Sequence, residues 1–264
     1  MKVWSIANQK GGVGKTTTAV SLAGMCVLHG SRTLLIDMDP HGSMTSYFGY
    51  DPESVQPSLY DLFQADQIGH GFTRSLIHKT SLAGLDLIPA STAIATLDKQ
   101  LGTKSGMGLV VINAIRQITE QYEHVFIDCP PMLGVLMVNA LAACDHLVIP
   151  VQTEFLAMKG LERMLNTIQM IEKAKSIHIN YTIVPTMFDR RTRASTDSLE
   201  YLREHYTEHL WRSVIPIDTL FRECSSNGLP ISHFRVSTRG ARAYSSLLED
   251  MIKGKSGNPQ VVAV

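Results

Sequence analysis

The stretch "IANQKGGVGKTTTAVSLAG", residues 6–24, decides how this chain folds. Gly14, Lys15 and Thr16 complete the pattern G-x-x-x-x-G-K-[ST], in which a glycine-rich loop wraps phosphate groups. A β-branched run, "VWSIA" (3–7), precedes the loop, and a helix-forming segment follows it, so the strand-loop-helix context of a phosphate-binding loop is present. Where the pattern has its first glycine, however, this chain has Gln9.

A phosphate-binding loop gives each of its residues a role. Backbone N–H groups and the helix start bind anions, the lysine reaches the β and γ phosphates, and the Thr16 hydroxyl binds Mg²⁺. The alternative is a glycine-rich turn with a helix cap at Thr16. At ordinary residue frequencies K-G-G-x-G-K-[ST] arises by accident in such a chain on the order of once in ten thousand, so we expect a nucleotide site. Its expected contacts are Gly11, Gly12, Val13, Gly14, Lys15, Thr16 and Thr17.

The bulk composition excludes several classes of protein. The 264 residues include 24 Lys and Arg and 24 Asp and Glu, so any DNA contact would need a local basic patch. The four cysteines are scattered, without the C-x-x-C spacing of zinc or iron–sulfur sites, and free thiols suit a reducing cytoplasm. There is no apolar signal-peptide core, and no stretch approaches the ~20 apolar residues of a membrane span. We therefore expect a cytoplasmic protein with no integral membrane segment.

Short β-branched runs alternate along the chain with longer segments of helical period. Strands are expected at 3–7, 33–37, 85–89, 124–128, 146–151 and 181–186. Helices are expected at 15–29, 107–121, 156–175, 195–208 and 238–253. This alternation is typical of an α/β fold with a doubly wound, mostly parallel sheet and helices on both faces. We expect one P-loop ATPase domain over 1–253 and a flexible tail at 254–264.

The spelling of the loop carries a family resemblance. "NQKGGVGKTT" (8–17), with Lys10 before two glycines, resembles the deviant Walker A motif of the ParA/MinD family of ATPases, and within it the Soj-like ParA branch. The resemblance implies that Lys10 crosses to the nucleotide of a second subunit when two ATP-loaded monomers meet face to face. A cation from a partner suits phosphoryl transfer, where catalysis is mostly positioning and electrostatic stabilisation. An ordinary solvated loop lysine is the alternative.

A second segment resembles the switch I region of the same family. In "LLIDMDPHGS" (34–43), the resemblance assigns Asp39 as the carboxylate that orients the attacking water near the metal, with Asp37 in support. His41 stands where the family commonly has glutamine. Histidine changes charge near neutral pH, so a pH-sensitive group is one interpretation, and a neutral ring that replaces the glutamine's hydrogen bond is the other.

The third matching segment, "HVFIDCPPMLG" (124–134), has the form of a Walker B strand that carries Asp128 to the metal, followed by switch II around 132–134. An isolated acid at a strand end could equally form a turn or a helix cap, so the assignment depends on the loop upstream. The implied metal site consists of Thr16, Asp39 and Asp128, and the implied catalytic residues are Lys10, Lys15 and Asp39.

Two later segments, 183–195 and 214–232, resemble the parts of the family that border the nucleotide and the dimer interface. The chain lacks the N-K-x-D motif that selects guanine, so ATP with Mg²⁺ is the expected nucleotide. The candidates for contact with adenine are Thr186, Met187, Pro216 and Ile217.

Arginines gather in the same two segments and just after them. Family members that bind the nucleoid place basic residues there, and a dimer would double the patch, which suits non-specific contact with DNA phosphates. The alternative is a solvated face with arginines paired to Asp189, Asp197 and Glu223. Because the first strand is expected at residue 3, we expect no N-terminal helix-turn-helix domain. The candidate DNA contacts are Arg190, Arg191, Arg193, Arg222, Arg235 and Arg239, with Arg242 beside them.

The resemblance implies an ATPase that dimerises with ATP, binds DNA non-specifically, and is released by slow hydrolysis that a cargo adaptor stimulates. The cargo would be a chemotaxis array at the cell pole or chromosome or plasmid DNA, and "DMDPHGSMTSYFGYDP" (37–52) looks closest to the array-positioning subgroup. A MinD-like or flagellar-number regulator at the membrane is the alternative, although the tail lacks the basic, bulky apolar helix it would use. An iron–sulfur carrier of the nitrogenase type would need a cysteine pair that the chain lacks.

Overall fold

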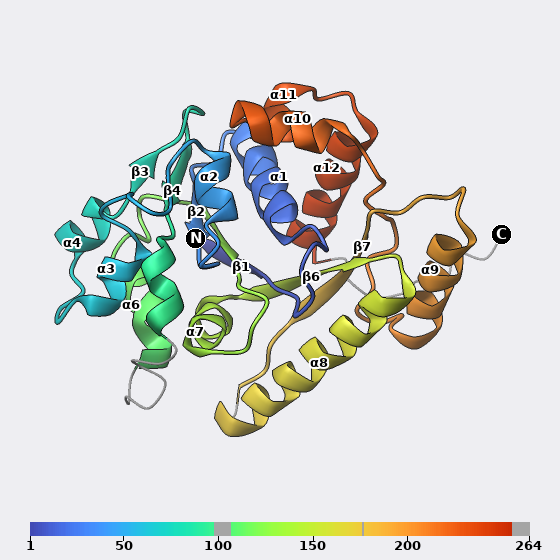
Figure 1. Ribbon diagram of the computed structural model, residues 1–264, viewed down its shortest axis with the longest axis horizontal. Helices are drawn as coiled ribbons and strands as arrows, with labels where there is room; N and C mark the ends of the chain where they lie inside the picture. The colour runs from blue at the N-terminus through green and yellow to red at the C-terminus, as the bar shows by residue number, and fades with distance from the viewer. Residues whose placement is uncertain (98–106, 176, 255–264) are drawn as a thin grey trace.

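The computed structural model describes residues 1–97, 107–175 and 177–254, and within them seven strands form one sheet (Figure 1). The sheet order is β3-β4-β2-β5-β1-β6-β7, and every neighbouring pair is parallel except β3 and β4. The strands are β1 (Lys2–Ile6), β2 (Thr33–Asp37), β3 (His78–Lys79), β4 (Leu85–Ile88), β5 (His124–Asp128), β6 (His146–Gln152) and β7 (Tyr181–Thr186). The expected α/β fold with a mostly parallel sheet is confirmed, and the short edge strand β3 is an addition to it.

Except for the edge strand β3, the strands are buried because they lie between two hydrophobic cores. Neighbouring residues of β1 point to opposite faces, so that Val3 packs into one core and Trp4 into the other. This explains why the strands appear as continuous apolar runs rather than as alternating patterns. Parallel strands also bring their carboxyl ends to one edge of the sheet, so the loops after β1, β2, β5 and β6 lie close together there.

Helices cover both faces of the sheet (Figure 1). The core beside Trp4 contains residues of α1 and α12, while the core beside Val3 contains residues of α6, α7 and α8. The helices are α1 (Lys15–Leu28), α2 (Ser43–Tyr47), α3 (Leu59–Gln64), α4 (His70–Ser75), α6 (Val110–Arg116), α7 (Val135–Ala143), α8 (Phe155–Lys175), α9 (Arg193–His205), α10 (Leu220–Asn227), α11 (Ile231–Phe234) and α12 (Arg239–Ile252), with 3₁₀ turns at Thr92–Thr96 and Met107–Leu109.

Four expected helices correspond to α1, α8, α9 and α12. The fifth, expected over 107–121, is wrong in extent: a 3₁₀ turn opens it and α6 ends at Arg116. Beyond that point the N–H groups of Gln117 and Ile118 bond to carbonyls three residues back, at 3.0 and 3.1 Å, which tightens the chain into turns. The sequence analysis also missed α7, since "VLMVNALAA" is apolar all round and shows no helical period.

The described helices include none long and apolar enough to cross a membrane. Apart from Gly254, the expected tail at 254–264 lies outside the described residues.

Candidate functional site

The loop between β1 and α1 has the backbone of a phosphate cradle. Gly12 and Gly14 adopt φ angles of 75° and 89°, in the left-handed region that a side chain disfavours. Gly14 is the residue immediately before α1, and α1 has no acidic residue in its first turn. Backbone N–H groups and the helix dipole attract anions to this helix start, and no acidic side chain of the first turn of α1 repels them.

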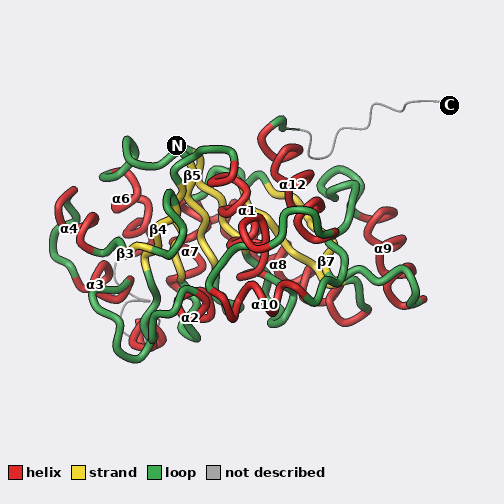
Figure 2. Tube along the Cα trace, turned by 90° about the horizontal axis from the view of Figure 1, so that it is seen from above, coloured by secondary structure: helices red, strands yellow, loops and turns green. Residues whose placement is uncertain are grey.

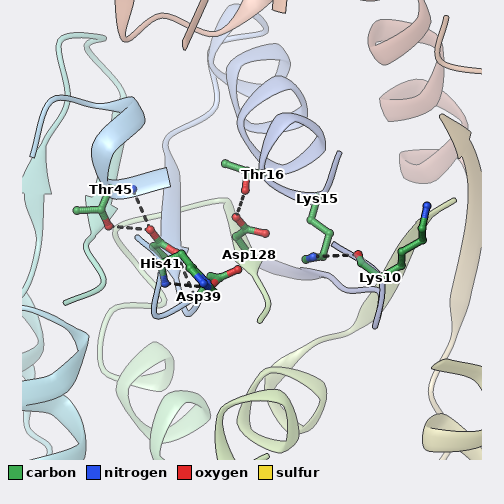
Figure 3. A network of polar contacts seen from close by, with 8 residues as sticks. Lys10, Lys15, Thr16, Asp39, His41, Thr45 and Asp128 are labelled. Atoms are coloured by element: carbon green, nitrogen blue, oxygen red, sulfur yellow. Dashed lines mark hydrogen bonds and ion pairs between the residues drawn. The ribbon is translucent and has the colours of Figure 1, made fainter. Parts of the chain in front are cut away.

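Lys15 lies across this loop and is buried, with 8% of its surface exposed. Its Nζ donates a hydrogen bond to the backbone carbonyl of Lys10, at 3.4 Å (Figure 3). Within the described ranges no carboxylate lies within ion-pair distance of this ammonium. A buried cation without a paired anion is costly, and a bound phosphate would supply the missing charge.

Lys10 points the other way. Its Nζ forms an ion pair with Glu154, at the start of α8, and lies 3.4 Å from Gln152 Oε1. In Figure 3 the Lys10 side chain extends away from Lys15, Thr16 and Asp128. The two lysines of the loop therefore point to different places: Lys15 lies across its own phosphate cradle, and Lys10 faces Glu154, just before α8.

The P-loop is braced against α8 at two further points. Gln9, which replaces the first glycine of the usual pattern, donates from Nε2 to Thr167 Oγ1 at 2.6 Å. Gly160 allows the loop to come close, because a Cβ at this position would lie 2.9 Å from the Cβ of Lys10. The substitution at Gln9 is thus accommodated as a loop-to-helix contact.

Carboxylates meet at the ends of β2 and β5. Asp37 and Asp128 occupy paired positions on these neighbouring strands. The Thr16 hydroxyl donates to Asp128 Oδ2 at 2.5 Å, and Asp37 Oδ2 accepts from the Thr45 N–H and hydroxyl at 2.8 and 2.7 Å. The fold therefore brings the first P-loop threonine next to the Walker B acid (Figure 3).

Burial makes both carboxyl groups, Asp37 and Asp128, weaker acids. Burial raises the pKa of Asp37 to about 6, and the hydrogen bonds from Thr45 oppose this rise. Burial, and after it the charge of Asp37, raise the pKa of Asp128 well above its usual range. Without a cation, two adjacent buried carboxylates disfavour each other's ionised form.

Magnesium fits this arrangement. Asp128 Oδ1 is buried and has no hydrogen-bond partner among the described residues, while Thr16 supplies a hydroxyl oxygen beside it. The described residues contain no ready group of three acidic, histidine or cysteine side chains for a metal. Mg²⁺ is usually held by one or two carboxylates together with substrate phosphates and water, so the protein need supply only part of the shell.

Asp39 follows on the loop after β2 and is held by His41. Asp39 Oδ1 accepts from the His41 backbone N–H at 3.0 Å and lies 2.8 Å from the ring Nδ1 (Figure 3). The His41 ring is exposed, whereas the Asp39 side chain is 14% exposed. The ring contact with Asp39 fits both interpretations of His41, because a neutral and a charged ring can each donate from Nδ1.

A cavity of about 490 Å³ opens beside the loop. Gly14, Thr16 and Thr17 of the loop line it. Met187, Pro216 and Ile217 line it too, so three adenine candidates share a cavity with the phosphate cradle. The Thr186 hydroxyl donates to the Val13 carbonyl at 2.9 Å and fixes this wall to the loop. Sequence reasoning missed several other lining residues: Ser43, Tyr47, Asp218, Phe221, Arg222, Ser225 and Tyr244.

The candidate DNA contacts are all exposed, but they do not share one environment. Arg191 and Arg193 pair with Asp189 and Asp197 at 2.7 and 3.4 Å, as the solvated-face alternative expects. Arg222 lines the cavity beside the P-loop. Arg190, Arg235 and Arg239 form no ion pair within the part of the chain that the structure describes.

Comparisons with known proteins agree with this geometry. A model of the AAA domain family matches residues 1–181. The chain is 35% identical over 257 residues to the sporulation initiation inhibitor protein Soj of Bacillus subtilis, covering 95% of this chain and 98% of that protein. It is 32% identical over 253 residues to the chromosome partitioning protein ParA of Myxococcus xanthus, covering 96% of this chain and 88% of that protein.

Among solved structures, the chain resembles the cobyrinic acid a,c-diamide synthase of Mycobacterium smegmatis, crystallised with ADP and magnesium. The TM-score is 0.83 and the identity 28%, and the match covers 99% of each chain.

Proposed function

The chain belongs to the ParA/MinD family of P-loop ATPases, in its Soj-like branch, and from this premise we propose that it is an ATP-driven dimerisation switch that positions a cellular cargo. The observation that carries the proposal is the opposite direction of the two loop lysines. Lys15 is buried in the phosphate cradle, and Lys10 is held at the rim, where a second subunit could receive it.

Each step of ATP hydrolysis has a candidate residue at this edge of the sheet. Lys15 and the α1 N-terminus bind the phosphates, and Thr16 and Asp128 hold Mg²⁺, which neutralises charge on the phosphates when bound. Asp39 positions the attacking water through Oδ2, since its Oδ1 is occupied by His41. Asp37 supports this loop through Thr45. Hydrolysis to ADP is slow until Lys10 and a stimulating partner complete the site.

Exposed apolar side chains support dimerisation at the same edge. Met132 and Leu133, after β5, are 73% and 47% exposed, and Phe155 and Leu156, at the start of α8, are 76% and 66% exposed. Large exposed apolar groups mark interaction surfaces. In a face-to-face ATP-bound homodimer these residues become buried, and the rim position of Lys10 comes near the partner's nucleotide.

Non-specific DNA is the track that we propose for the dimer. Arg190, Arg235 and Arg239 are exposed and free of ion pairs in the described ranges, and dimerisation would double their number. Phosphate contacts of this kind bind without reading sequence and weaken steeply with salt.

The cargo and its adaptor define the biological role. Relatives named for chromosome partitioning support a partition-type switch acting in the cytoplasm, on the nucleoid or at the pole. The array-like spelling of switch I supports a chemotaxis array as the cargo, with DNA as the second candidate. A MinD-like membrane regulator is the alternative, and sedimentation with anionic liposomes in the presence of ATP distinguishes it from a DNA-bound switch.

The proposed track is tested by titrating duplex DNA of arbitrary sequence with purified protein in ATP, in ADP and without nucleotide, over a salt series. Binding only with ATP, which weakens as salt rises, is expected. Equal binding in all three states, or none in any, would refute a nucleotide-controlled DNA switch.

A further inference from the structure

One face of α10 points into the nucleotide cavity. The cavity is lined by Phe221, Arg222 and Ser225 of α10, with Ser225 four and three residues after the other two, and by Asp218, two residues before the helix. Residues at these spacings share one side of a helix. The P-loop residues Gly14, Thr16 and Thr17 line the same cavity. Arg222 therefore belongs to a helix face directed at the predicted nucleotide, and it is not simply part of the outer basic surface.

The charges around the cavity leave Arg222 available for an anion. The lining residues that carry charge are Asp218 and Arg222. Asp218 is already used by the backbone: its Oδ1 accepts from Leu220 N at 3.1 Å and its Oδ2 from Gly240 N at 3.2 Å. Within the described ranges Arg222 forms no ion pair, in contrast to Arg191, which is held by its own aspartate.

The backbone that carries Arg222 is fixed at both ends of α10. At the start, Phe221 packs edge-on against Tyr244, with ring centroids 5.8 Å apart. At the end, the carbonyl of Leu229 accepts a hydrogen bond from the Tyr47 hydroxyl at 2.9 Å. Tyr47 belongs to α2, which follows switch I, and Figure 2 shows α2 and α10 side by side. The fixed backbone keeps Arg222 beside the cavity, so that only its side chain has to be ordered when it contacts a ligand.

We propose that Arg222 is a nucleotide-binding residue whose guanidinium donates hydrogen bonds to phosphate oxygens of the bound adenine nucleotide. This rests on the nucleotide site of the proposed function, and it assigns Arg222 a role different from that of Arg239. Guanidinium matches phosphate geometry better than ammonium does, because its donors lie in a planar fork. The site thereby receives positive charge from α10 in addition to Lys15.

The test measures the affinity for ADP and for a non-hydrolysable ATP analogue with Mg²⁺ and without DNA, by calorimetry or a fluorescent nucleotide. Arg222→Gln should weaken both nucleotides about tenfold to a hundredfold, as expected for a lost charge-assisted hydrogen bond. Arg222→Lys, which retains the charge, should lose less. Arg239→Gln is the matched control outside the cavity, and its nucleotide affinity should equal that of the wild type.

The outcomes separate this proposal from the wider function. A wild-type affinity of Arg222→Gln for both nucleotides would overturn the proposal. A loss of DNA binding in the same variant would place Arg222 in the DNA-binding surface instead. If the wild type bound nucleotide but no DNA, the proposed track would fail, and the nucleotide affinities would still decide the role of Arg222. A wild-type protein that bound no adenine nucleotide would overturn both. Arg222 is exposed, so unchanged thermal melting without nucleotide should exclude misfolding of the variants.

Discussion

Lys10 forms an ion pair with Glu154 of its own chain, at the rim of the nucleotide site. The Lys10 side chain is 23% exposed, and its ammonium lies on the β6–α8 side, away from the Thr16–Asp128 pair (Figure 3). It therefore makes no contribution to the phosphate cradle of its own subunit in this conformation. To act at a second subunit, Lys10 must break its ion pair with Glu154 and bind a phosphate of the nucleotide held by that subunit.

Lys10→Ala should therefore separate nucleotide binding from dimerisation. ATP affinity should change less than about threefold, since the cradle and Lys15 remain, whereas the ATP-dependent dimer should be lost. Nucleotide titration and light scattering measure the two properties. Lys159→Ala is the matched control, because Lys159 also lies near the start of α8 but pairs with Glu162 at 2.9 Å. A wild-type level of dimer in the Lys10 variant would refute the action of Lys10 across subunits.

Lys15→Ala should strongly weaken nucleotide binding, measured at MgATP concentrations close to the wild-type dissociation constant. The expected loss of affinity is about tenfold to a hundredfold or more, because a charge-assisted contact to phosphate is removed. The increase in melting temperature that MgATP gives the wild type should disappear with it. Retention of that increase would show that Lys15 does not contact the phosphates.

Asp128→Asn should stabilise the protein without nucleotide and weaken the effect of Mg²⁺. The variant removes a buried like-charge pair with Asp37 while keeping an oxygen for the Thr16 hydroxyl. The melting temperature should rise by several degrees, as about 1 kcal/mol corresponds to ~2–4 °C in a domain of this size. Asp197→Asn, at an exposed position, is the control. A lower melting temperature for Asp128→Asn would contradict the account of this carboxylate pair.

Asp37 should make the stability of the nucleotide-free protein depend on pH. Burial raises its pKa from the ordinary 3.8 to about 6, so the folded state binds this proton more tightly than the unfolded chain does. The contribution of Asp37 to the free energy of unfolding therefore decreases as pH rises from about 4 to about 6. The melting temperatures of the wild type and of Asp37→Asn, plotted against pH, should agree near pH 4. Above pH 6 the melting temperature of the variant should be the higher of the two. Parallel curves would contradict the shift.

Much of the fold was predictable because its signals are local. The strand "VWSIA", the glycine loop and the helix after it are adjacent in sequence, and the apolar runs of β2, β5, β6 and β7 stand out by composition. The meeting of Asp37 with Asp128 also follows from sequence, since parallel strands end at one edge.

The missed features depend on distance along the chain or on weak local signals. Lys10 and Glu154 are 144 positions apart, and so are brought together only by the order of the strands. Strand β3 has two residues, too few for any alternation to appear. The place of Arg222 in the cavity lining was missed because Arg222 resembled one more surface arginine. The spacing of Phe221, Arg222 and Ser225 was the signal that could have identified the face of α10 that lines the cavity.

The most direct test of the switch is the mass in solution of Asp39→Ala with MgATP, measured by light scattering after gel filtration. This variant should bind ATP without hydrolysing it, and should therefore accumulate as a dimer that the wild type forms only transiently. Adding Lys10→Ala to the same chain should return it to a monomer with ATP still bound. A monomeric Asp39→Ala protein saturated with ATP, or a double variant that remains dimeric, would contradict the proposed switch.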